Sequence, residues 1–363
     1  MSRSRWKVGI IGATGMVGQR FLSLLENHPW FEVTILAASS RSSGKTYKEA
    51  LEGRWALPSA MPARFSTMPV MDSAQVKEIA DHVDFIFCAV DMPKEEVIQL
   101  EEAFAKTETP VVSNNSALRM TPDVPMIIPE INPDHAAVIS AQRRRLGTKT
   151  GFITVKPNCS IQSYVPALHP LRDFGIEKVS VCTYQALSGA GKTFESWPEM
   201  VDNVIPFIKG EEEKSEREPL KIWGEIEEEK IRNASLPLIS AQCLRVASSD
   251  GHMAAVSVSF QKKPSIAEIL DRWTTFEGIP QRRNLPSAPR PFLRYFSEDD
   301  RPQTRLDRNE GNGMAVSIGR LRPDSLFDYR FVALSHNTIR GAAGGAVLTA
   351  EFLCAEGWIP KKE

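Results

Sequence analysis

The sequence has no excess charge of either sign and no long apolar run. Its 44 Lys and Arg residues, set against 45 Asp and Glu residues, leave a formal net charge of −1. A basic surface that coats nucleic acid is therefore not expected. The longest stretch without Asp, Glu, Lys or Arg, 157–171, contains three prolines, so it does not qualify as a membrane helix. We expect no nucleic-acid partner and no membrane partner.

Cysteine is sparse and shows no pairing pattern. The five cysteines are odd in number and scattered, and no two of them form a Cys-x-x-Cys pair. A disulfide scaffold and a zinc ribbon are therefore disfavoured, and we expect no metal. Cys88 and Cys182 lie within apolar strand-like runs and Cys354 on an apolar helix, where a buried thiol is usually an inert small hydrophobe.

Length and composition indicate a globular protein with two domains. A chain of 363 residues exceeds one comfortable hydrophobic core. With 42% hydrophobic and 25% charged residues, disorder is not expected. The basic start, residues 1–6, leads into a strand-like run without an apolar signal core or a cleavage site. We therefore expect a cytoplasmic protein.

Strand-like and helix-like segments alternate in the first half of the chain. Apolar runs predict strands at 8–11, 31–38, 85–90 and 110–113, and helical periodicity predicts helices at 15–26 and 93–106. Strands that alternate with helices form a parallel sheet, so we expect a doubly wound, Rossmann-like α/β domain. The pattern weakens at 134–150, which we interpret as an exposed segment.

Beyond residue 156 the strand pattern changes. Apolar and polar residues alternate in 179–184 and 254–260, which is typical of strands with one solvated face. We therefore expect a mixed sheet in a second α/β domain. Residues 281–312 are rich in Pro, Arg and Asn and predict a long loop or arm. A last helix is expected from 341 to about 356, beginning with small residues that permit close packing.

Glycines at 12, 15 and 18 have the spacing G-x-x-G-x-x-G between the first predicted strand and the first predicted helix. Glycine allows a tight turn and close backbone approach, and a helix N-terminus offers N–H groups to a pyrophosphate. We interpret the motif as a dinucleotide site; a glycine-rich turn without a ligand is the alternative. The candidate cofactor-binding residues are Gly12, Thr14, Gly15, Met16 and Val17.

The end of the second predicted strand favours NADP over NAD. An NAD site would carry an Asp or Glu there for the ribose 2′-hydroxyl, and residues 39–45 contain none. They offer hydroxyl groups and cations suited to a 2′-phosphate, with Ser39, Arg41 and Ser42 as candidates. A solvated serine-rich loop is the alternative interpretation.

Cys159 stands at a predicted junction between strand and helix. It follows the strand-like run 152–155, and apolar residues then have helical spacing from 161 to 168. With Asn158 as the N-cap, the cysteine would lie in the first helical turn. There the helix dipole stabilises a thiolate, and N–H groups can hold an oxyanion. Pro166 should kink or shorten this helix.

Six histidines could serve as the base for such a cysteine. His28 and His135 adjoin proline or acidic turn residues, and His169 lies between a leucine and a proline. His252 opens a predicted strand directly after a turn, seven residues beyond Arg245. Strand entrances beside turns are common sites for catalytic groups, although a surface histidine would show the same pattern.

Together these motifs resemble the aspartate-β-semialdehyde dehydrogenases, most of all their archaeal and fungal branch. The similarity extends over nearly the whole chain, and the order and spacing of the motifs are more specific than any one of them. The matching segments are 12–18, 113–119, 157–160, 185–191, 245–246 with 251–252, 301–308 and 340–344.

The resemblance implies NADPH-dependent reductive dephosphorylation of L-aspartyl-4-phosphate to L-aspartate 4-semialdehyde, in the biosynthesis of lysine, threonine and methionine. Cys159 would be the nucleophile that forms a thioester. His252 would be the general acid and base, activating the thiol and handling the proton on the thiohemiacetal oxygen. Gln185 would orient the substrate and the intermediate.

The resemblance also implies substrate-binding residues. Arg245 would hold the α-carboxylate, a task suited to its planar guanidinium. Glu211 would hold the α-amino group, with Glu212 as a rival because the assignment could slip by one residue. Without the resemblance, the charged run 211–218 would predict a solvated helix face. The phosphate-binding positions match Arg119, Asn158 and Lys214.

The nicotinamide end of the cofactor has candidates of its own. Ser188 and Gly189 belong to a loop that would let the nicotinamide approach the thioester, and Asn337 would contact its carboxamide side. Lys156 and Ile161 depart from the family pattern, and we expect neither to touch the chemistry directly.

The resemblance further implies domain boundaries and an assembly. Residues 1–157, completed by 341–363, would bind NADP, and 158–340 would form the catalytic and dimerisation domain. The active site would lie between the two domains. The second sheet would form the interface of a homodimer or homotetramer, so the expected partners are the substrate, inorganic phosphate and further copies of the chain.

The same residues are compatible with other functions. Malonyl-CoA reductase, or another acyl reductase on this scaffold, would use the same cysteine and histidine without an α-amino site or a phosphate cluster. N-acetyl-γ-glutamyl-phosphate reductase fits less well, because Gly and Tyr normally surround its cysteine, unlike 158–160 here. A noncatalytic NADP-binding regulator would bind the cofactor without turnover.

Overall fold

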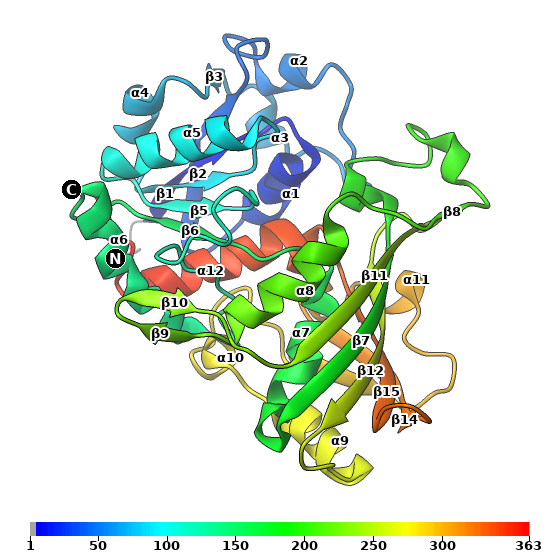
Figure 1. Cartoon of the computed structure of the whole chain (residues 1–363). Coiled ribbons are helices and arrows are strands. Elements are labelled where there is room, and N and C mark those ends of the chain that lie inside the picture. Colours follow the sequence, from blue (N-terminus) through cyan, green and yellow to red (C-terminus); the bar gives the residue numbers. More distant parts are fainter. Residues whose placement is uncertain (1–4, 363) are drawn as a thin grey trace.

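The computed structural model describes residues 5–362, so residues 1–4 of the basic start lie outside the described part. The first sheet contains β1 (Trp6–Ile11), β2 (Phe31–Ala38), β3 (Val70–Asp72), β4 (Phe85–Cys88), β5 (Val111–Ser113) and β6 (Ile153–Val155). Its order is β3-β2-β1-β4-β5-β6, and every neighbouring pair is parallel. This strand order is that of a Rossmann fold, so the doubly wound prediction is confirmed (Figure 1).

Helices connect the strands of this sheet. They are α1 (Met16–Leu25), α2 (Tyr47–Leu51), α3 (Ala63–Ser66), α4 (Val76–Ala80), α5 (Lys94–Lys106) and α6 (Ile139–Leu146). The interpretation of 134–150 as an exposed segment is wrong in part, because Arg144, Arg145 and Gly147 are exposed but one face of the segment is buried. A 3₁₀ turn, Pro133–Val138, leads into α6, and the fully buried side-chain amide of Gln142 donates to the Ile153 carbonyl at 2.9 Å. The sequence did not indicate the buried face of this short helix, because three consecutive arginines, 143–145, interrupt its apolar pattern.

The second sheet is mixed, as predicted. It contains β7 (Ile176–Gln185), β8 (Val204–Ile205), β11 (Leu238–Val246), β12 (His252–Phe260), β13 (Leu293–Phe296), β14 (Val316–Pro323) and β15 (Tyr329–Ser335). Its order is β13-β14-β15-β12-β7-β11-β8, with parallel pairs at β13/β14 and β7/β11. Along β12 every second residue is buried, which confirms the alternation predicted for 254–260. A separate hairpin consists of β9 (Glu225–Glu227) and β10 (Lys230–Arg232).

The second half also carries helices α7 (Ile161–Leu168), α8 (Glu211–Ile222), α9 (Ile266–Thr275), α10 (Ile279–Arg282), α11 (Thr304–Asp307) and α12 (Gly344–Ala355). The prediction of a long loop at 281–312 is therefore wrong in part, because β13 and α11 fall inside it. Only two buried residues of β13, Leu293 and Phe296, give that strand an apolar signal. The pairing of β13 with β14 supplies the hydrogen bonds that its sequence does not predict.

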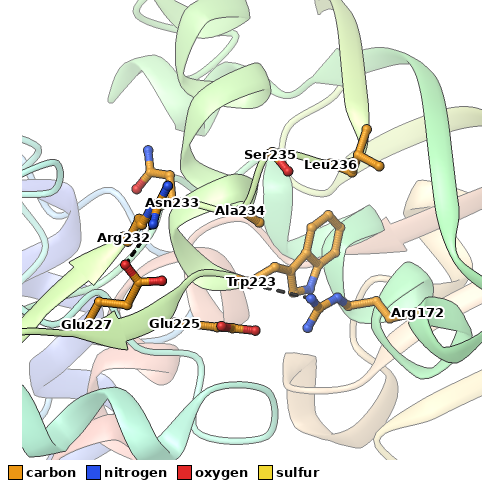
Figure 2. A pocket seen from close by; sticks show the side chains of 9 residues that line it. All are labelled: Arg172, Trp223, Glu225, Glu227, Arg232, Asn233, Ala234, Ser235 and Leu236. Atoms are coloured by element: carbon orange, nitrogen blue, oxygen red, sulfur yellow. Dashed lines mark hydrogen bonds and ion pairs between the residues drawn. The ribbon is translucent and has the colours of Figure 1, made fainter.

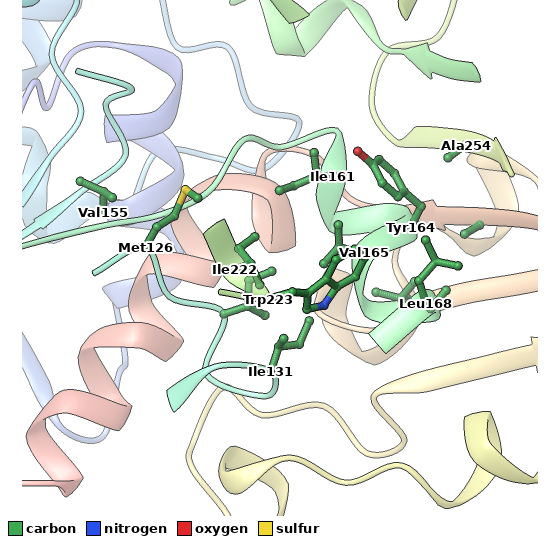
Figure 3. Packing of buried hydrophobic residues seen from close by; sticks show 14 of the residues in the cluster. Met126, Ile131, Val155, Ile161, Tyr164, Val165, Leu168, Ile222, Trp223 and Ala254 are labelled. Atoms are coloured by element: carbon green, nitrogen blue, oxygen red, sulfur yellow. The ribbon is translucent and has the colours of Figure 1, made fainter. Parts of the chain in front are cut away.

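Helices α7 and α12 lie at the centre of the molecule (Figure 1). Ile161, Val165 and Leu168 of α7 belong to one buried cluster with Ile222 and Trp223 at the end of α8, as Figure 3 shows. Pro166 lies inside α7, which passes at His169 into a 3₁₀ turn. Helix α12 is buried along its whole length from 344 to 354 and contacts α1 and β5 of the first sheet.

The predicted domain boundaries at 157/158 and 340/341 stay a prediction. Between residues 5 and 362, no helix has both the length and the apolar character needed to cross a bilayer.

Candidate active site

A cavity of about 240 Å³ lies beyond the carboxyl ends of β1, β2 and β4, where the strand order of the sheet reverses. Gly12 there has φ +88°, and a Cβ on it would lie 2.2 Å from the carbonyl oxygen of Ala89. Helix α1 begins at Met16, and its N-cap, Gly15, offers no side-chain cap, so the first N–H groups of the helix are available to an anion. Of the predicted cofactor residues, the cavity is lined by Gly12, Thr14, Gly15, Ser39 and Arg41.

A second cavity, of about 200 Å³, lies between α1 and the loop that follows β7. Met16 and Ser188 line it, together with Arg20, Lys192 and Arg308, which the sequence analysis missed. Arg20 follows Met16 by four residues, and that helical spacing is the signal that could have identified it. Val17 and Ser42 line neither of these two cavities.

Asn337 joins the second cavity to the turn before β12. Its side-chain amide donates to the Ser188 hydroxyl at 2.8 Å, and its side-chain oxygen accepts from the Gly251 N–H at 2.8 Å. The contact with Ser188 places Asn337 beside the loop predicted to receive the nicotinamide.

Cys159 is partly buried and lies just before α7. The prediction that it occupies the first helical turn is wrong, because the helix begins at Ile161 with Ser160 as its N-cap. The side-chain oxygen of Asn158 accepts from the Ser160 N–H at 2.8 Å and from its hydroxyl at 2.7 Å. The bond to the Ser160 N–H is of the kind that caps a helix start, and Cys159 and Ser160 form a turn that leads directly into α7. A Cβ on Gly341 would lie 2.9 Å from the Cβ of Cys159, so that glycine makes room for it.

Glu211 lies at the centre of a polar cluster beside this turn. Its carboxylate accepts from the Asn158 amide at 3.0 and 3.1 Å, from the Gln185 amide at 3.2 Å and from the Lys214 amine at 2.8 Å. Glu212 accepts instead from the backbone N–H of Cys243 at 3.3 Å. Burial opposes ionisation of Glu211, but the ion pair with Lys214 gives a net lowering of its pKa. The geometry therefore favours Glu211 over Glu212 as the substrate-facing carboxylate.

His252 is fully buried at the start of β12. Its Nδ1 accepts from the Ala186 N–H at 3.1 Å, so the neutral ring carries its proton on Nε2. Nε2 has no hydrogen-bond partner within the described part of the chain. Burial, with the nearby Arg245 cation, lowers the pKa of His252 to about 3, which keeps the ring neutral at physiological pH.

Gly189 brings the loop after β7 against two of the predicted site residues, Arg245 and His252. A Cβ on it would lie 2.9 Å from Arg245 Nη1 and 2.9 Å from His252 Nε2. Arg245 Nη1 also donates to the carbonyl of Ala186 in the same loop, at 2.7 Å. Three separate predictions, Gly189, Arg245 and His252, therefore meet at one place.

Two residues of α8 that contact the predicted site, Glu218 and Lys221, were not predicted from the sequence. Glu218 accepts from the backbone N–H of Asn158 at 2.6 Å and from Arg119 Nη1 at 2.9 Å. The buried amine of Lys221 donates to three carbonyls at 2.6 to 2.8 Å, among them that of Arg119. Glu211 and Glu218 lie seven residues apart, two helical turns, so one face of the charged run is buried. That spacing was the available signal.

Charged groups from several elements act on the Cys159 thiol. Burial and Glu211 raise the pKa of Cys159 to about 11, while Lys156, Arg119 and Arg245 lower it. The expectation that Lys156 does not touch the chemistry directly stays a prediction, although its charge acts on the thiol. Its side chain is buried beside the cysteine, with 2% of the residue exposed.

A further cavity lies away from these residues. It has a volume of about 360 Å³, and Figure 2 shows Arg172, Trp223 and Arg232 lining it near the β9–β10 hairpin. None of the predicted site residues lines it. Among residues 5–362, no group of three or more His, Cys, Asp or Glu side chains is placed to hold a metal ion.

Known proteins match this chain along almost its whole length. The family "semialdehyde dehydrogenase, NAD binding domain" matches residues 7–139, and "semialdehyde dehydrogenase, dimerisation domain" matches 168–340. The aspartate-semialdehyde dehydrogenase of Archaeoglobus fulgidus is 42% identical over 97% of this chain and 99% of that protein. The one from Aspergillus fumigatus is 41% identical over 97% of this chain and 98% of that protein.

Solved structures agree with the sequence relatives. Aspartate semialdehyde dehydrogenase with NADP from Candida albicans has a TM-score of 0.88 and 37% identity to this chain. The match covers 98% of this chain and 100% of that one. Extensive identity to archaeal and fungal relatives, together with the shared fold, shows that this chain belongs to the aspartate-semialdehyde dehydrogenase family.

Proposed function

We propose that the protein catalyses the NADPH-dependent reductive dephosphorylation of L-aspartyl-4-phosphate to L-aspartate 4-semialdehyde. The observation that carries this proposal is the convergence of Glu211 on Asn158 and Gln185, beside Cys159. An ionised, buried carboxylate suits an α-ammonium group, which malonyl-CoA lacks. The names of the archaeal and fungal relatives support the same reaction.

The substrate would be held by charge at both ends. Glu211 would bind the α-ammonium group and Arg245 the α-carboxylate. At the other end, Arg119, Asn158 and Lys214 would bind the phosphate. Gln185, hydrogen bonded to Glu211, would orient the acyl group.

Cys159 would attack the acyl carbon as a thiolate. A C–S bond forms, the bond from the acyl carbon to the phosphate oxygen breaks, and the thioester and free phosphate result. NADPH, when bound, would supply the hydride that reduces the acyl group. Collapse of the thiohemiacetal then releases the aldehyde and returns the electron pair of the C–S bond to Cys159.

His252 would act on the oxygen of the acyl group. Because its Nδ1 accepts from Ala186, the resting ring can donate its Nε2 proton to the developing oxyanion. The same nitrogen recovers the proton when the thiohemiacetal collapses to the aldehyde. The resting tautomer is thus suited to donation rather than to removing the proton of the thiol.

NADP is the proposed cofactor. The uncapped start of α1 would receive the pyrophosphate, and Ser39 and Arg41 at the end of β2 would face the 2′-phosphate. The nicotinamide would lie near Ser188, Gly189 and Asn337. The Candida albicans structure with NADP supports this choice.

The proposed assembly is a homodimer or homotetramer formed through the dimerisation domain at 168–340. The proposed location is the cytoplasm. All five cysteines are free thiols, as expected for a reducing compartment.

The test is NADPH formation from aspartate semialdehyde and NADP, with and without inorganic phosphate, run beside malonyl-CoA reduction. We expect phosphate-dependent NADPH formation and no turnover of malonyl-CoA. Turnover of malonyl-CoA alone would assign the protein to the other reductase. NADP binding without either turnover would indicate a regulator.

A further inference from the structure

Lys156 is a buried cation with almost no hydrogen-bond support. It lies between the end of β6 and the turn that carries Cys159, with 2% of the residue exposed. Its amine donates to the carbonyl of Pro157 at 2.8 Å, the one hydrogen bond it makes within residues 5–362. An ammonium has three donors, so a buried lysine with a single acceptor needs another source of stabilisation when charged.

Lys156 and Cys159 pack against the same segment of backbone. A Cβ on Gly341 would lie 2.9 Å from Cys159 Cβ, and one on Gly345 would lie 2.8 Å from Lys156 Cε. These glycines are four residues apart, where the π-turn Ile339–Ala343 passes into α12. The side chains of Lys156 and Cys159 therefore both pack against this one segment.

The other cations near Lys156 already have carboxylate partners. Arg119, from the loop after β5, pairs with Glu218 of α8 at 2.9 Å. Arg340, from the turn before α12, pairs with Glu130 at 2.6 Å, and both side chains are almost completely buried. Lys156 forms no ion pair with any carboxylate in the described residues.

The charges that face Cys159 are Glu211 from α8, Lys156, Arg119, and Arg245 at the end of β11. Glu211 disfavours a thiolate, and the proposed function engages Arg245 and Arg119 with the two ends of the substrate. Among the three cations, Lys156 is the one that neither pairs with a carboxylate nor is proposed to bind the substrate.

We propose that Lys156 is a positioning residue whose ammonium stabilises the Cys159 thiolate, a role that His252 does not fill in its resting tautomer. The proposal rests on the proposed function in one respect, that Cys159 is the nucleophile. No proton needs to pass between the two side chains, because the ammonium acts by its charge.

The charge on Lys156 changes close to neutral pH. Burial, with the nearby Arg119 cation, lowers the pKa of Lys156 to about 7, although Cys159 opposes this effect. Below that pH the ammonium is present and favours the thiolate, and above it this support is lost. The thiolate fraction should therefore rise with pH, flatten around neutrality, and rise again at higher pH as the thiol itself titrates.

The test is the rate of Cys159 alkylation by iodoacetamide as a function of pH, followed by mass spectrometry of the peptide that contains Cys159. No substrate is used, so the result does not depend on whether the proposed reaction takes place. Wild-type protein should show a shoulder between about pH 6 and pH 8. Lys156→Met should show a single rise, about tenfold slower at about pH 6, and should approach the wild type at about pH 9, since one pKa unit is a tenfold change.

Lys77→Met is the matched control, because Lys77 is exposed on α4, and its profile should equal that of the wild type. NADP binding, measured by fluorescence, checks that Lys156→Met is folded. A folded Lys156→Met protein with the wild-type profile would overturn the proposal. If that variant does not fold, the wild-type profile decides: a shoulder supports the role of Lys156, and a single rise overturns it.

Discussion

The two sides of the active site are held in different ways. On the side of Cys159, a charged side chain holds the turn in place. The Glu218 carboxylate of α8 accepts from the Asn158 N–H at 2.6 Å and from Arg119 at 2.9 Å. On the side of His252, the backbone holds the imidazole ring. The Ala186 N–H donates to Nδ1 of His252 at 3.1 Å, and the ring lies so close to Gly189 that there is no room for a Cβ there. Changes of charge should therefore disturb the nucleophile side, and changes of size should disturb the histidine side.

The difference has a chemical reason. In the proposed mechanism the nucleophile side would bind a phosphate and stabilise a thiolate, so it would need cations, and buried cations need carboxylates to hold them. The histidine side must hold one neutral ring in one tautomer, which a single backbone N–H can do. Each side thus uses the kind of contact that its task requires.

The largest effect is expected from Cys159→Ser, which removes the nucleophile and leaves both sides otherwise intact. We expect turnover to fall by about 10³-fold or more, because a serine hydroxyl without an adjacent base is a poor nucleophile. Steady-state kinetics measure the loss, and NADP binding should survive as the control. Turnover near the wild-type level would remove Cys159 from the mechanism.

Gly189→Ala tests the histidine side by size alone. The added Cβ would lie 2.9 Å from Arg245 Nη1 and from His252 Nε2, so both groups must move. We expect kcat to fall by about 100-fold, the effect of a displacement near 1 Å in an active site.

Gly191→Ala is the matched control for that variant, because no atom lies within 4 Å of its Cβ position. Its φ of +67° makes alanine strained by about 1–2 kcal/mol, so thermal stability should fall slightly while kcat holds. Equal losses of kcat in both variants would show that the loop, and not the contact with His252, is responsible.

Arg245→Lys tests recognition of the substrate on the same side. One ammonium cannot reproduce a bidentate contact with a carboxylate. We expect the KM for aspartate semialdehyde to rise about thirtyfold, with a smaller change in kcat, from the loss of about 2 kcal/mol in charged hydrogen bonding. An unchanged KM would remove Arg245 from the carboxylate site.

Glu218→Gln tests the nucleophile side by charge at nearly constant size. The amide can accept from Asn158 or from Arg119, but its NH₂ group must then face the other donor. We expect the KM for phosphate to rise about tenfold, more than the KM for aspartate semialdehyde, because Arg119 loses its partner.

Glu213→Gln, on the exposed face of the same helix, is the control and should leave both constants unchanged. An equal rise of both KM values in Glu218→Gln would point to a general loss of structure. Glu218→Asp should recover little, because the shorter side chain cannot reach both donors.

Local patterns predicted much of the fold. Strand β2 was predicted at its observed bounds, and α1 and α5 within one residue at each end, because alternation, helical period and a proline before the helix act over a few neighbours. The 134–150 and 281–312 segments were misread because their buried faces are short and charged or proline-rich residues surround them. The contact of the Gln142 side chain with β6 and the pairing of β13 with β14 decide these two segments, and neither is a local property.

For the candidate site, too, the sequence predicted some features and not others. The roles of Cys159, His252 and the cofactor loops stay predictions, but the sequence motifs already placed them at turns beside strands. The position of Cys159 before α7 was not predictable, because the helix begins at Ile161, and a difference of two residues at a helix start cannot be read from the sequence pattern.

What the sequence by itself determined is the parallel nucleotide-binding sheet, the glycine turn after β1, and the family to which the chain belongs, because all three are written in short motifs with fixed spacing. Only the tertiary structure decided that one face of the charged α8 is buried, that Glu218 joins Arg119 to Asn158, and that Lys156 lies enclosed beside Cys159. A charged residue looks the same in a sequence whether water or protein surrounds it, and the fold determines which of these charges lose their water.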